Sequence, residues 1–208
     1  MFDAQILFSR TGFSGGLGYE LLIPWDQAER CLQSLLDSKM GTEITFVGVQ
    51  TGTTLRLEVG FLIPGWDFPV PGHGPEANPT DYRNPFEMGL GWLVELNDQR
   101  DFIGKAALER IAREDPQRTN LVVVVDQGGA LSINGSKIFS SEGAELGAVF
   151  VDGFSATLGR TVGFCLVDAK RCKAGDAVLV SESKIAAKLH NQPLLTFKER
   201  TQTPPPGI

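Results

Sequence analysis

The stretch SRTGFSGGLGYELLIPWDQAERCL, residues Ser9–Leu32, places a glycine-rich segment between two short apolar stretches. The residues before Ser9 alternate weakly between apolar and polar, and LLIPW follows Glu20 as a second strand-like run. Because glycine adopts positive φ without strain, this arrangement predicts a hairpin or bulged connection between two strands. A glycine-rich turn of this kind can cradle a phosphate, close a hairpin, or let the backbone approach a flat ligand.

The glycine segment does not match a nucleotide-binding loop. A Walker loop ends in Gly-Lys-Ser/Thr, whereas GGLGYE places the carboxylate of Glu20 where a phosphate would be repelled. A dinucleotide fingerprint opens a helix, whereas Gly16 and Gly18 lead into an apparent strand. What remains is a close approach of the backbone to a ligand, with Glu20 able to accept paired N–H donors from an aminopyrimidine-type ring. The alternative is that Glu20 is an outward-facing strand residue.

Composition and charge exclude several classes of protein. The chain has 208 residues, 42% of them hydrophobic, with a formal net charge of -6 and a pI near 5.0. An acidic chain without a basic run gives no general attraction to nucleic acid or to an anionic membrane. The apolar runs are strand-sized, far below the roughly 20 residues that span a bilayer. The first residues have neither the basic region nor the apolar region of a signal peptide, so we expect a cytoplasmic protein.

Cysteine and histidine offer little material for a metal site or for catalysis. Cys31, Cys165 and Cys172 are odd in number and lack CxxC spacing, which predicts buried reduced thiols rather than a disulfide or a metal site. His73 and His190 belong to no HExxH or His/Cys cluster, and we expect both at the surface. No GxSxG nucleophile motif occurs.

The N-terminal part of the chain predicts two helices and a strand after the hairpin. Asp26, three residues before Glu29, has the spacing of a capping box for an amphipathic helix that ends near Gly41. The run ITFVGV, residues 44–49, predicts a strand. TTLRLEVG, residues 53–60, predicts a brief helix capped by one of its first two threonines and closed by its glycine.

The second half changes from helix and loop to strands. Residues 64–85 are rich in proline and glycine and form a long loop, and DFIGKAALERIARED, residues 101–115, predicts a helix with Ala107, Leu108 and Ile111 inward. From Leu121 onward, five short strands at about ten-residue spacing predict a small all-β barrel or sandwich. We therefore expect an α+β chain, with one domain at 1–115, a β domain at 119–200 and a disordered tail at 201–208.

Several segments of this sequence resemble one family, in register over nearly the whole chain. SRTGFSGGLGYEL is similar to the RTGxTGxxGYE signature of the glycine-cleavage T-protein family, the tetrahydrofolate-dependent aminomethyltransferases and their demethylase relatives. GTTLRLEVGF, NPFEMGLGW and DFIGKAAL resemble further motifs of that family, and GAELGAVFVDGFSATLGRTVGFCLV resembles the pattern of its C-terminal barrel.

The resemblance implies a fold, a cofactor and binding residues. It implies a ring of subdomains around a central folate channel, flanked by the barrel, and tetrahydrofolate as the cofactor. Glu20 falls on the glutamate that holds the pterin ring, next to Tyr19 of the same motif. Phe13 stands where many members have tyrosine, so only ring stacking remains there. Arg56 falls on an arginine of the folate site, with a buried ion pair to a neighbouring acid as the alternative.

The resemblance also implies an activity, partners and a departure from the family pattern. It implies a one-carbon transferase that takes a methyl or aminomethyl donor and a lipoyl carrier protein as partners. The family's catalytic aspartate lies upstream of the glycine signature, so we expect an incomplete copy that lacks its N-terminal half. We therefore assign no catalytic residue, and Asp67 in the long loop is the only tempting substitute. We expect Trp92 and Phe86 to pack in the core rather than to contact a ligand.

Two other functions stay open. One is a non-catalytic folate-binding scaffold, although the Lys-Gly-Cys motif of such relatives is missing near FIGKAAL. The other is the C-terminal module of a flavin-dependent demethylating dehydrogenase. The linker from Gly60 to Glu87, which is longer than in aminomethyltransferases, resembles the demethylating branch and leaves the reaction subtype open.

Overall fold

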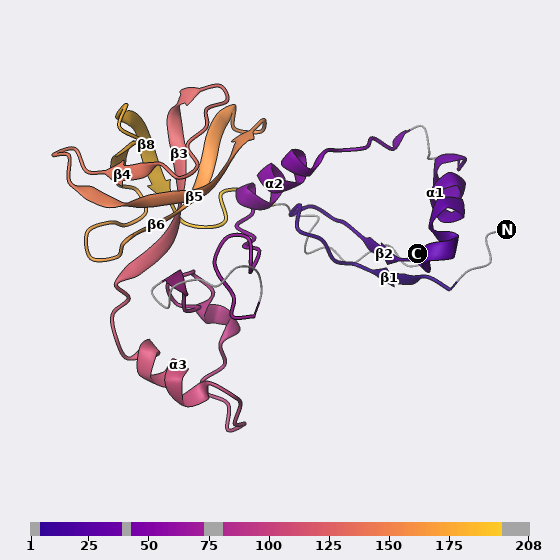
Figure 1. Ribbon diagram of the computed structural model, residues 1–208, viewed down its shortest axis with the longest axis horizontal. Helices are drawn as coiled ribbons and strands as arrows, with labels where there is room; N and C mark the ends of the chain where they lie inside the picture. The colour runs from indigo at the N-terminus through magenta and orange to yellow at the C-terminus, as the bar shows by residue number, and fades with distance from the viewer. Residues whose placement is uncertain (1–4, 39–42, 73–80, 197–208) are drawn as a thin grey trace.

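A computed structural model describes residues 5–38, 43–72 and 81–196. A β-barrel forms the main body, and two extensions project from it (Figure 1). One extension, here called the N-terminal arm, comprises residues 5–38 and 43–48 and is joined to the barrel through helix α2. The other carries helix α3.

The barrel consists of six antiparallel strands closed in the order β3-β6-β5-β4-β7-β8. The strands are β3 (Arg118–Gly128), β4 (Lys137–Phe139), β5 (Glu145–Ser155), β6 (Arg160–Asp168), β7 (Ala177–Val180) and β8 (Ile185–His190). The five predicted strands are present, and the α+β class with a C-terminal barrel is confirmed. Sequence reading missed β4, because three residues are too few to show an alternating pattern.

Alternation along β3 divides the apolar residues between two clusters. Leu121, Val123 and Val125 point into the barrel core, and Val122 and Val124 pack outside it with Leu57 of α2. Because side chains alternate between the two faces of a strand, a continuous apolar run marks a strand that is covered on both faces. The outer cluster therefore fixes α2 against the barrel.

Helix α2 (Val49–Glu58) begins earlier than the sequence predicted. Its N-cap is Gly48, without a side-chain cap hydrogen bond, so the predicted threonine cap is wrong. Gly60, at φ +78°, follows its end as predicted. The helix lies close to β5 at Gly153, where an added Cβ would be 2.7 Å from the Thr54 hydroxyl. A side chain at position 153 would therefore push α2 off the barrel.

The N-terminal arm holds the predicted hairpin. β1 (Leu7–Ser9) and β2 (Glu20–Leu22) pair antiparallel, with Ser9 opposite Glu20. The glycine segment docks on α2 at Gly15, which has φ +85° and where an added Cβ would lie 2.1 Å from the Val59 side chain. The turn needs glycine at this position for both reasons.

Two other predictions for the arm are wrong. Asp26 lies inside a short 3-10 helix, η1 (Trp25–Gln27), and makes no cap for α1 (Ala28–Leu36). Residues 44–48 form no strand, because nothing among the described residues pairs with them.

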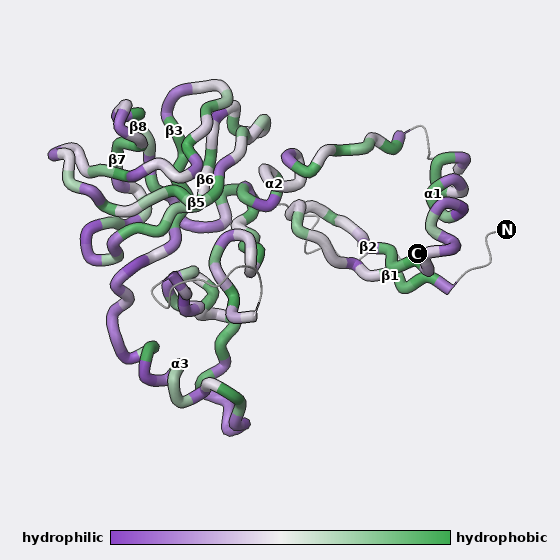
Figure 2. Tube along the Cα trace, viewed as in Figure 1, coloured by the Kyte–Doolittle hydropathy of each residue, from purple (hydrophilic) through white to green (hydrophobic). Residues whose placement is uncertain are grey.

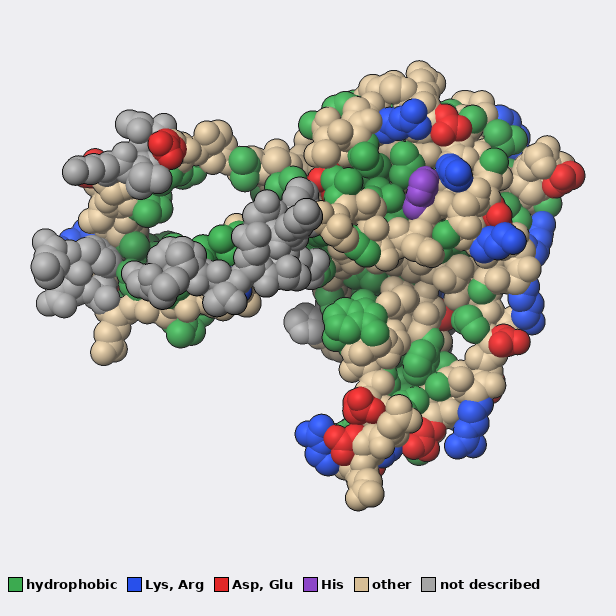
Figure 3. Space-filling view, turned by 180° about the vertical axis from the view of Figure 1, so that it is seen from behind, with side chains coloured by type: hydrophobic (Ala, Val, Ile, Leu, Met, Phe, Trp, Pro, Cys, Tyr) green, Lys and Arg blue, Asp and Glu red, His purple; other side chains and the backbone are tan. Residues whose placement is uncertain are grey.

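The apolar residues of the arm are largely uncovered. Within its described residues only Gly15 is buried, while Trp25 is 95%, Phe46 71% and Leu7 64% exposed. Apolar stretches follow β1, β2 and one face of α1, and apolar side chains reach the surface of the arm (Figures 2 and 3). Exposed apolar side chains gathered in one segment are typical of a region that packs against further polypeptide.

The second extension carries η4 (Gly91–Leu93) and α3 (Lys105–Ala112). Trp92 is 80% exposed and Ala107 is also exposed, so the predicted core packing of Trp92 and the inward placement of Ala107 are wrong. Leu108 and Ile111 of α3 are half-buried. His73 and the predicted disordered tail lie outside the described residues, and the division into domains at residues 115–119 stays a prediction.

Candidate functional site

The Glu20 carboxylate lies at the loop end of the hairpin, where the glycine segment enters β2. It is exposed, and the hydroxyl of Thr11 donates a hydrogen bond to its Oε2. The Ser9 hydroxyl lies 3.0 Å from that of Thr11 and extends the polar contact across the strand pair. Thr11 therefore orients Oε2 of Glu20. Because the residue is exposed, the other carboxylate oxygen, Oε1, is accessible to an N–H donor.

A cavity of about 290 Å³ lies beside Thr11, the hydrogen-bond partner of this carboxylate, although Glu20 itself is not among the described residues that line it. Its lining includes Thr11, Gly12, Gly15, Gly16, Gly18 and Phe61. Because Thr11 both lines the cavity and binds Glu20, the carboxylate is connected directly to the cavity wall. The glycines leave backbone without side chains there, which suits the close approach of a flat molecule.

Phe13 and Tyr19, the two aromatic residues predicted for the site, lie in and next to the glycine segment and differ in their surroundings. Phe13 is 50% exposed and lies near Gly52 of α2, where an added Cβ would be 3.8 Å from the ring. Tyr19 stacks on Phe8 of the facing strand, with ring centroids 4.7 Å apart. Phe13 is therefore available for stacking on a ligand, whereas one face of Tyr19 is already occupied.

The guanidinium of Arg56 forms a buried ion pair with the carboxylate of Asp67. Its Nη1 lies 2.6 Å from Oδ2 of Asp67 and its Nη2 lies 2.9 Å from Oδ1, and both side chains are at most 3% exposed. The ion pair that the sequence analysis left as the alternative is therefore formed. Nη1 also donates to the backbone oxygen of Phe61 at 3.0 Å. Arg56 thus reaches the glycine cavity only through Phe61, which lines it.

Asp67 cannot serve as a free acid in this arrangement. In addition to both guanidinium contacts, its Oδ2 accepts a hydrogen bond from the Ile63 N–H at 2.6 Å. A bidentate, shielded guanidinium–carboxylate pair is a strong positioning contact. The carboxylate holds the start of the long loop to α2.

A second buried polar pair joins α2 to the barrel, and sequence reading missed it. The Ser155 hydroxyl donates to Oε1 of Glu58 at 2.5 Å and accepts from the Leu158 N–H at 3.0 Å. Ser155 is fully buried and Glu58 is 1% exposed. The two residues lie far apart in sequence, and the only sequence signal was that each falls within a motif of the family resemblance.

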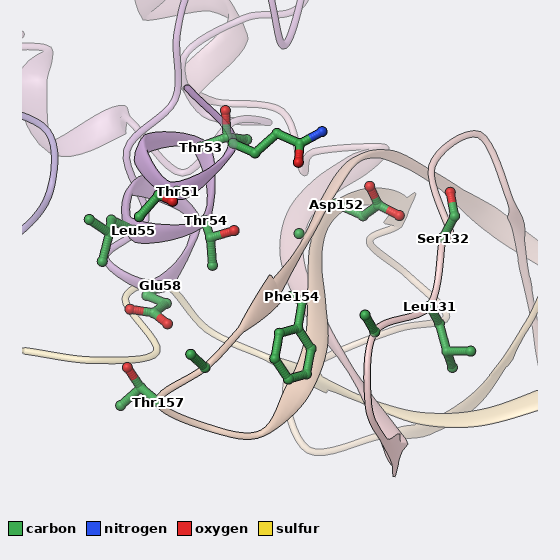
Figure 4. A pocket seen from close by; sticks show the side chains of 14 residues that line it. Thr51, Thr53, Thr54, Leu55, Glu58, Leu131, Ser132, Asp152, Phe154 and Thr157 are labelled. Carbon is green, nitrogen blue, oxygen red and sulfur yellow. The ribbon is translucent and has the colours of Figure 1, made fainter. Parts of the chain in front are cut away.

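The larger cavity beside this pair has a volume of about 620 Å³. Figure 4 shows Thr51, Thr54 and Glu58 projecting from α2 toward the β5–β6 hairpin, which carries Asp152, Phe154 and Thr157. None of the predicted site residues lines it. The structure therefore groups Glu20, Phe13 and Tyr19 around the hairpin and keeps Arg56 in the adjoining helix.

The described residues contain neither a membrane-spanning helix nor a metal-binding cluster. Among the described residues, no helix is long and apolar enough to cross a membrane. In the same part of the chain, no group of three or more His, Cys, Asp or Glu side chains has the arrangement of a metal site. The three cysteines are free thiols, with Cys165 and Cys172 buried and Cys31 half-buried.

Comparison with known proteins supports the motif resemblance. The family model described as GCVT N-terminal domain matches residues 1–98. Aminomethyltransferase of Thermotoga neapolitana is 32% identical over 177 residues, covering 85% of this chain and 44% of that protein. Aminomethyltransferase of Herpetosiphon aurantiacus is 33% identical over 187 residues, covering 89% of this chain and 47% of that protein.

A solved structure shares the fold. The crystal structure of glycine cleavage system aminomethyltransferase T from Bartonella henselae aligns with a TM-score of 0.76 at 23% identity. The alignment covers 93% of this chain and 50% of that chain, so the match includes most of the barrel and both extensions. The chain spans about half the length of the curated relatives it matches. The chain thus belongs to the glycine-cleavage T-protein (aminomethyltransferase) family.

Proposed function

We propose that this chain is part of a tetrahydrofolate-dependent one-carbon transferase, which passes a methyl or aminomethyl group from a small-molecule donor to the folate. Family membership supports the reaction class. The single structural observation that carries the proposal is the exposed Glu20 carboxylate, held by Thr11 beside a glycine-lined cavity. This donor and acceptor set fits a pterin ring, whose N–H groups need an anionic acceptor and whose flat faces need open backbone.

The residues of this chain would bind and orient the folate. Glu20 accepts the N–H donors at the edge of the ring, the glycine segment contacts its face, and Phe13 supplies a stacking surface. The folate, when bound, supplies the nucleophilic nitrogen. Holding that nitrogen in one orientation relative to the donor is the main contribution that a protein makes to a transfer of this type.

The partners we propose are the one-carbon donor, a lipoyl carrier protein, and polypeptide equivalent to the half of the relatives that this chain does not match. The uncovered apolar faces of the N-terminal arm support the last of these. The structural alignment covers 93% of this chain but only 50% of a chain of about twice its length. The added polypeptide would cover the arm and complete the folate channel.

A second candidate function is a folate-binding scaffold without catalysis. The observation that favours it is the engagement of Asp67, the only substitute acid identified in the sequence, in a buried ion pair. The scaffold and the transferase share the Glu20 site and differ only in turnover.

The experiment that tests the site measures the affinity of the 208-residue chain for 5-methyltetrahydrofolate by calorimetry. Glu20→Gln keeps the shape and removes the charge, and the loss of a charge-assisted pair should weaken binding by about 1.5–3 kcal/mol. Glu29→Gln, an exposed change on α1, is the matched control and should bind as the wild type does. Equal affinities for Glu20→Gln and wild type would remove the basis for the site.

A further inference from the structure

The cavity of about 620 Å³ beside α2 has one wall from the helix and one from the barrel. Figure 4 shows Thr51, Thr54 and Glu58 on the helix side, and Asp152 and Phe154 of β5 on the other side. A single water needs only about 10–15 Å³. The cavity therefore has room for a small organic molecule.

The charged side chains that line this cavity are both acidic. Glu58 and Asp152 line it, and none of the described lining residues is Lys, Arg or His. Within the described chain, neither carboxylate forms an ion pair. Opposite charges attract more strongly where water is partly excluded, so the cavity favours a cation. Because the described residues hold no cluster of three or more metal-ligating side chains, an organic cation fits better than a metal ion.

Asp152 offers one carboxylate oxygen to a ligand in the cavity. Its Oδ2 accepts hydrogen bonds from the N–H of Ile133 at 2.5 Å and from the N–H of Asn134 at 2.9 Å. Its Oδ1 has no partner among the described residues, and it is not one of their buried unpaired atoms. The barrel therefore holds the carboxylate in place and leaves Oδ1 accessible, on a side chain that lines the cavity.

Glu58 adds a buried negative charge on the helix side. It is 1% exposed, its Oε1 accepts the hydrogen bond from Ser155, and its Oε2 has no partner in the described part of the chain. A buried carboxylate without a cation is costly for a fold. A cation in the adjoining cavity lowers this cost through its charge, without a contact to Oε2.

Hydroxyl groups and an aromatic ring also line the cavity. The hydroxyls of Thr51, Thr54 and Thr157 have no hydrogen-bond partner among the described residues. An ammonium group has three N–H donors and no acceptor, so it matches carboxylate and hydroxyl oxygens. Phe154 is 39% exposed, and the face of an aromatic ring attracts a cation.

We propose that this cavity binds a small organic amine as its ammonium ion, which donates a hydrogen bond to Oδ1 of Asp152. The apolar part of the amine lies against Phe154 and Leu131. The buried charge of Glu58 strengthens the binding from the helix side. This site shares no lining residue with the glycine cavity, and its occupancy does not depend on the proposed function.

Benzylamine, which is positively charged at neutral pH, is the probe for this site. Its affinity for the 208-residue chain can be measured by ligand-observed NMR titration. Benzyl alcohol has nearly the same shape without the charge, and it should bind at least about ten-fold more weakly because the charge-assisted hydrogen bond is lost. This comparison uses the unaltered protein, so it does not depend on the folding of a variant. Absence of benzylamine binding, or equal affinity for both probes, would overturn the proposal.

Asp152→Asn separates the charge at the site from the shape of the cavity. Asparagine can keep its side-chain oxygen on the N–H groups of Ile133 and Asn134 and then turns its NH₂ group toward the ligand. We expect benzylamine to bind at least about ten-fold more weakly, and benzyl alcohol to bind as it does to the wild type. Unchanged benzylamine affinity, or an equal loss for both probes, would refute the proposal.

Two further variants complete the test. Asp126→Asn removes the same charge from the barrel at a side chain that is 57% exposed, and this matched control should bind benzylamine as the wild type does. Glu58→Gln removes the buried charge and should weaken benzylamine binding by a smaller factor than Asp152→Asn, because Glu58 acts only through its charge. A loss in Asp126→Asn as large as that in Asp152→Asn would overturn the assignment to this cavity.

Discussion

Replacing Asp67 by asparagine should destabilise the chain strongly, because Arg56 would stay buried without its counter-charge. Asp67 receives three short contacts, two from the guanidinium at 2.6 and 2.9 Å and one from the Ile63 N–H at 2.6 Å. Asparagine keeps one acceptor oxygen and turns an NH₂ group toward the other donors. The change removes the negative charge at position 67. It also places the NH₂ group of asparagine next to an N–H donor of Arg56 or Ile63.

The magnitude follows from burial. Removing one partner of a buried ion pair costs about 3–5 kcal/mol, and the single acceptor that asparagine retains places this change near the lower end, at about 3 kcal/mol. For a chain of this size a loss of 1 kcal/mol lowers the melting temperature by roughly 2–4 °C. We therefore expect a decrease on the order of 10 °C.

The assays are thermal unfolding and urea unfolding of the 208-residue chain, both followed by far-ultraviolet circular dichroism. Arg56→Lys should also destabilise, because an ammonium group cannot form the planar two-bond contact. Asp98→Asn is the matched control, since it removes an ion pair with Arg100, whose side chain is 83% exposed, and it should leave the unfolding midpoint nearly unchanged. Unfolding midpoints for Asp67→Asn and Asp98→Asn that are the same would refute the reasoning.

Two further predictions concern the barrel. Ser155→Ala removes the hydrogen bond to Glu58 and should lower the free energy of unfolding by about 1.5–3 kcal/mol in the same urea assay, whereas the exposed Ser141→Ala should have no effect. A loss below the error of the assay would show that Glu58 is satisfied in another way. Burial raises the pKa of the Cys165 and Cys172 thiols, so in the native chain only Cys31 should react with a thiol reagent at neutral pH, and all three should react in urea. Fast reaction of three thiols in the native chain would contradict the buried placement.

The features that the sequence predicted correctly are those with local causes. The hairpin follows from glycines between two apolar runs, and Gly15 meets both demands, positive φ and close approach to Val59. The barrel strands follow from alternation and from turn residues at regular spacing. The end of α2 follows from Gly60.

The features that the sequence missed depend on contacts between distant segments. The strand predicted at residues 44–49 needs a pairing partner, no described residue supplies one, and Val49 instead begins α2. Trp92 is predicted to pack in the core, yet its side chain is 80% exposed to the rest of the described chain. Glu58 and Ser155 meet only because α2 packs on β5.

The candidate site shows the same division. Glu20 and Phe13 belong to one local segment that the motif marks, and their role as folate-binding residues stays a prediction. Arg56 carried two possible roles, and only the folded loop brings Asp67 to its guanidinium.

The most direct test of the proposed function is the formation of methylated or methylenated tetrahydrofolate from candidate methyl and aminomethyl donors. We predict no turnover above the uncatalysed rate from the 208-residue chain alone. We predict turnover when the chain is joined to the segment of the Herpetosiphon aurantiacus relative that it does not match, and a lower rate there when Glu20 is replaced by glutamine. Turnover from the chain alone, or turnover in the joined protein that is the same with and without the Glu20 carboxylate, would contradict the account.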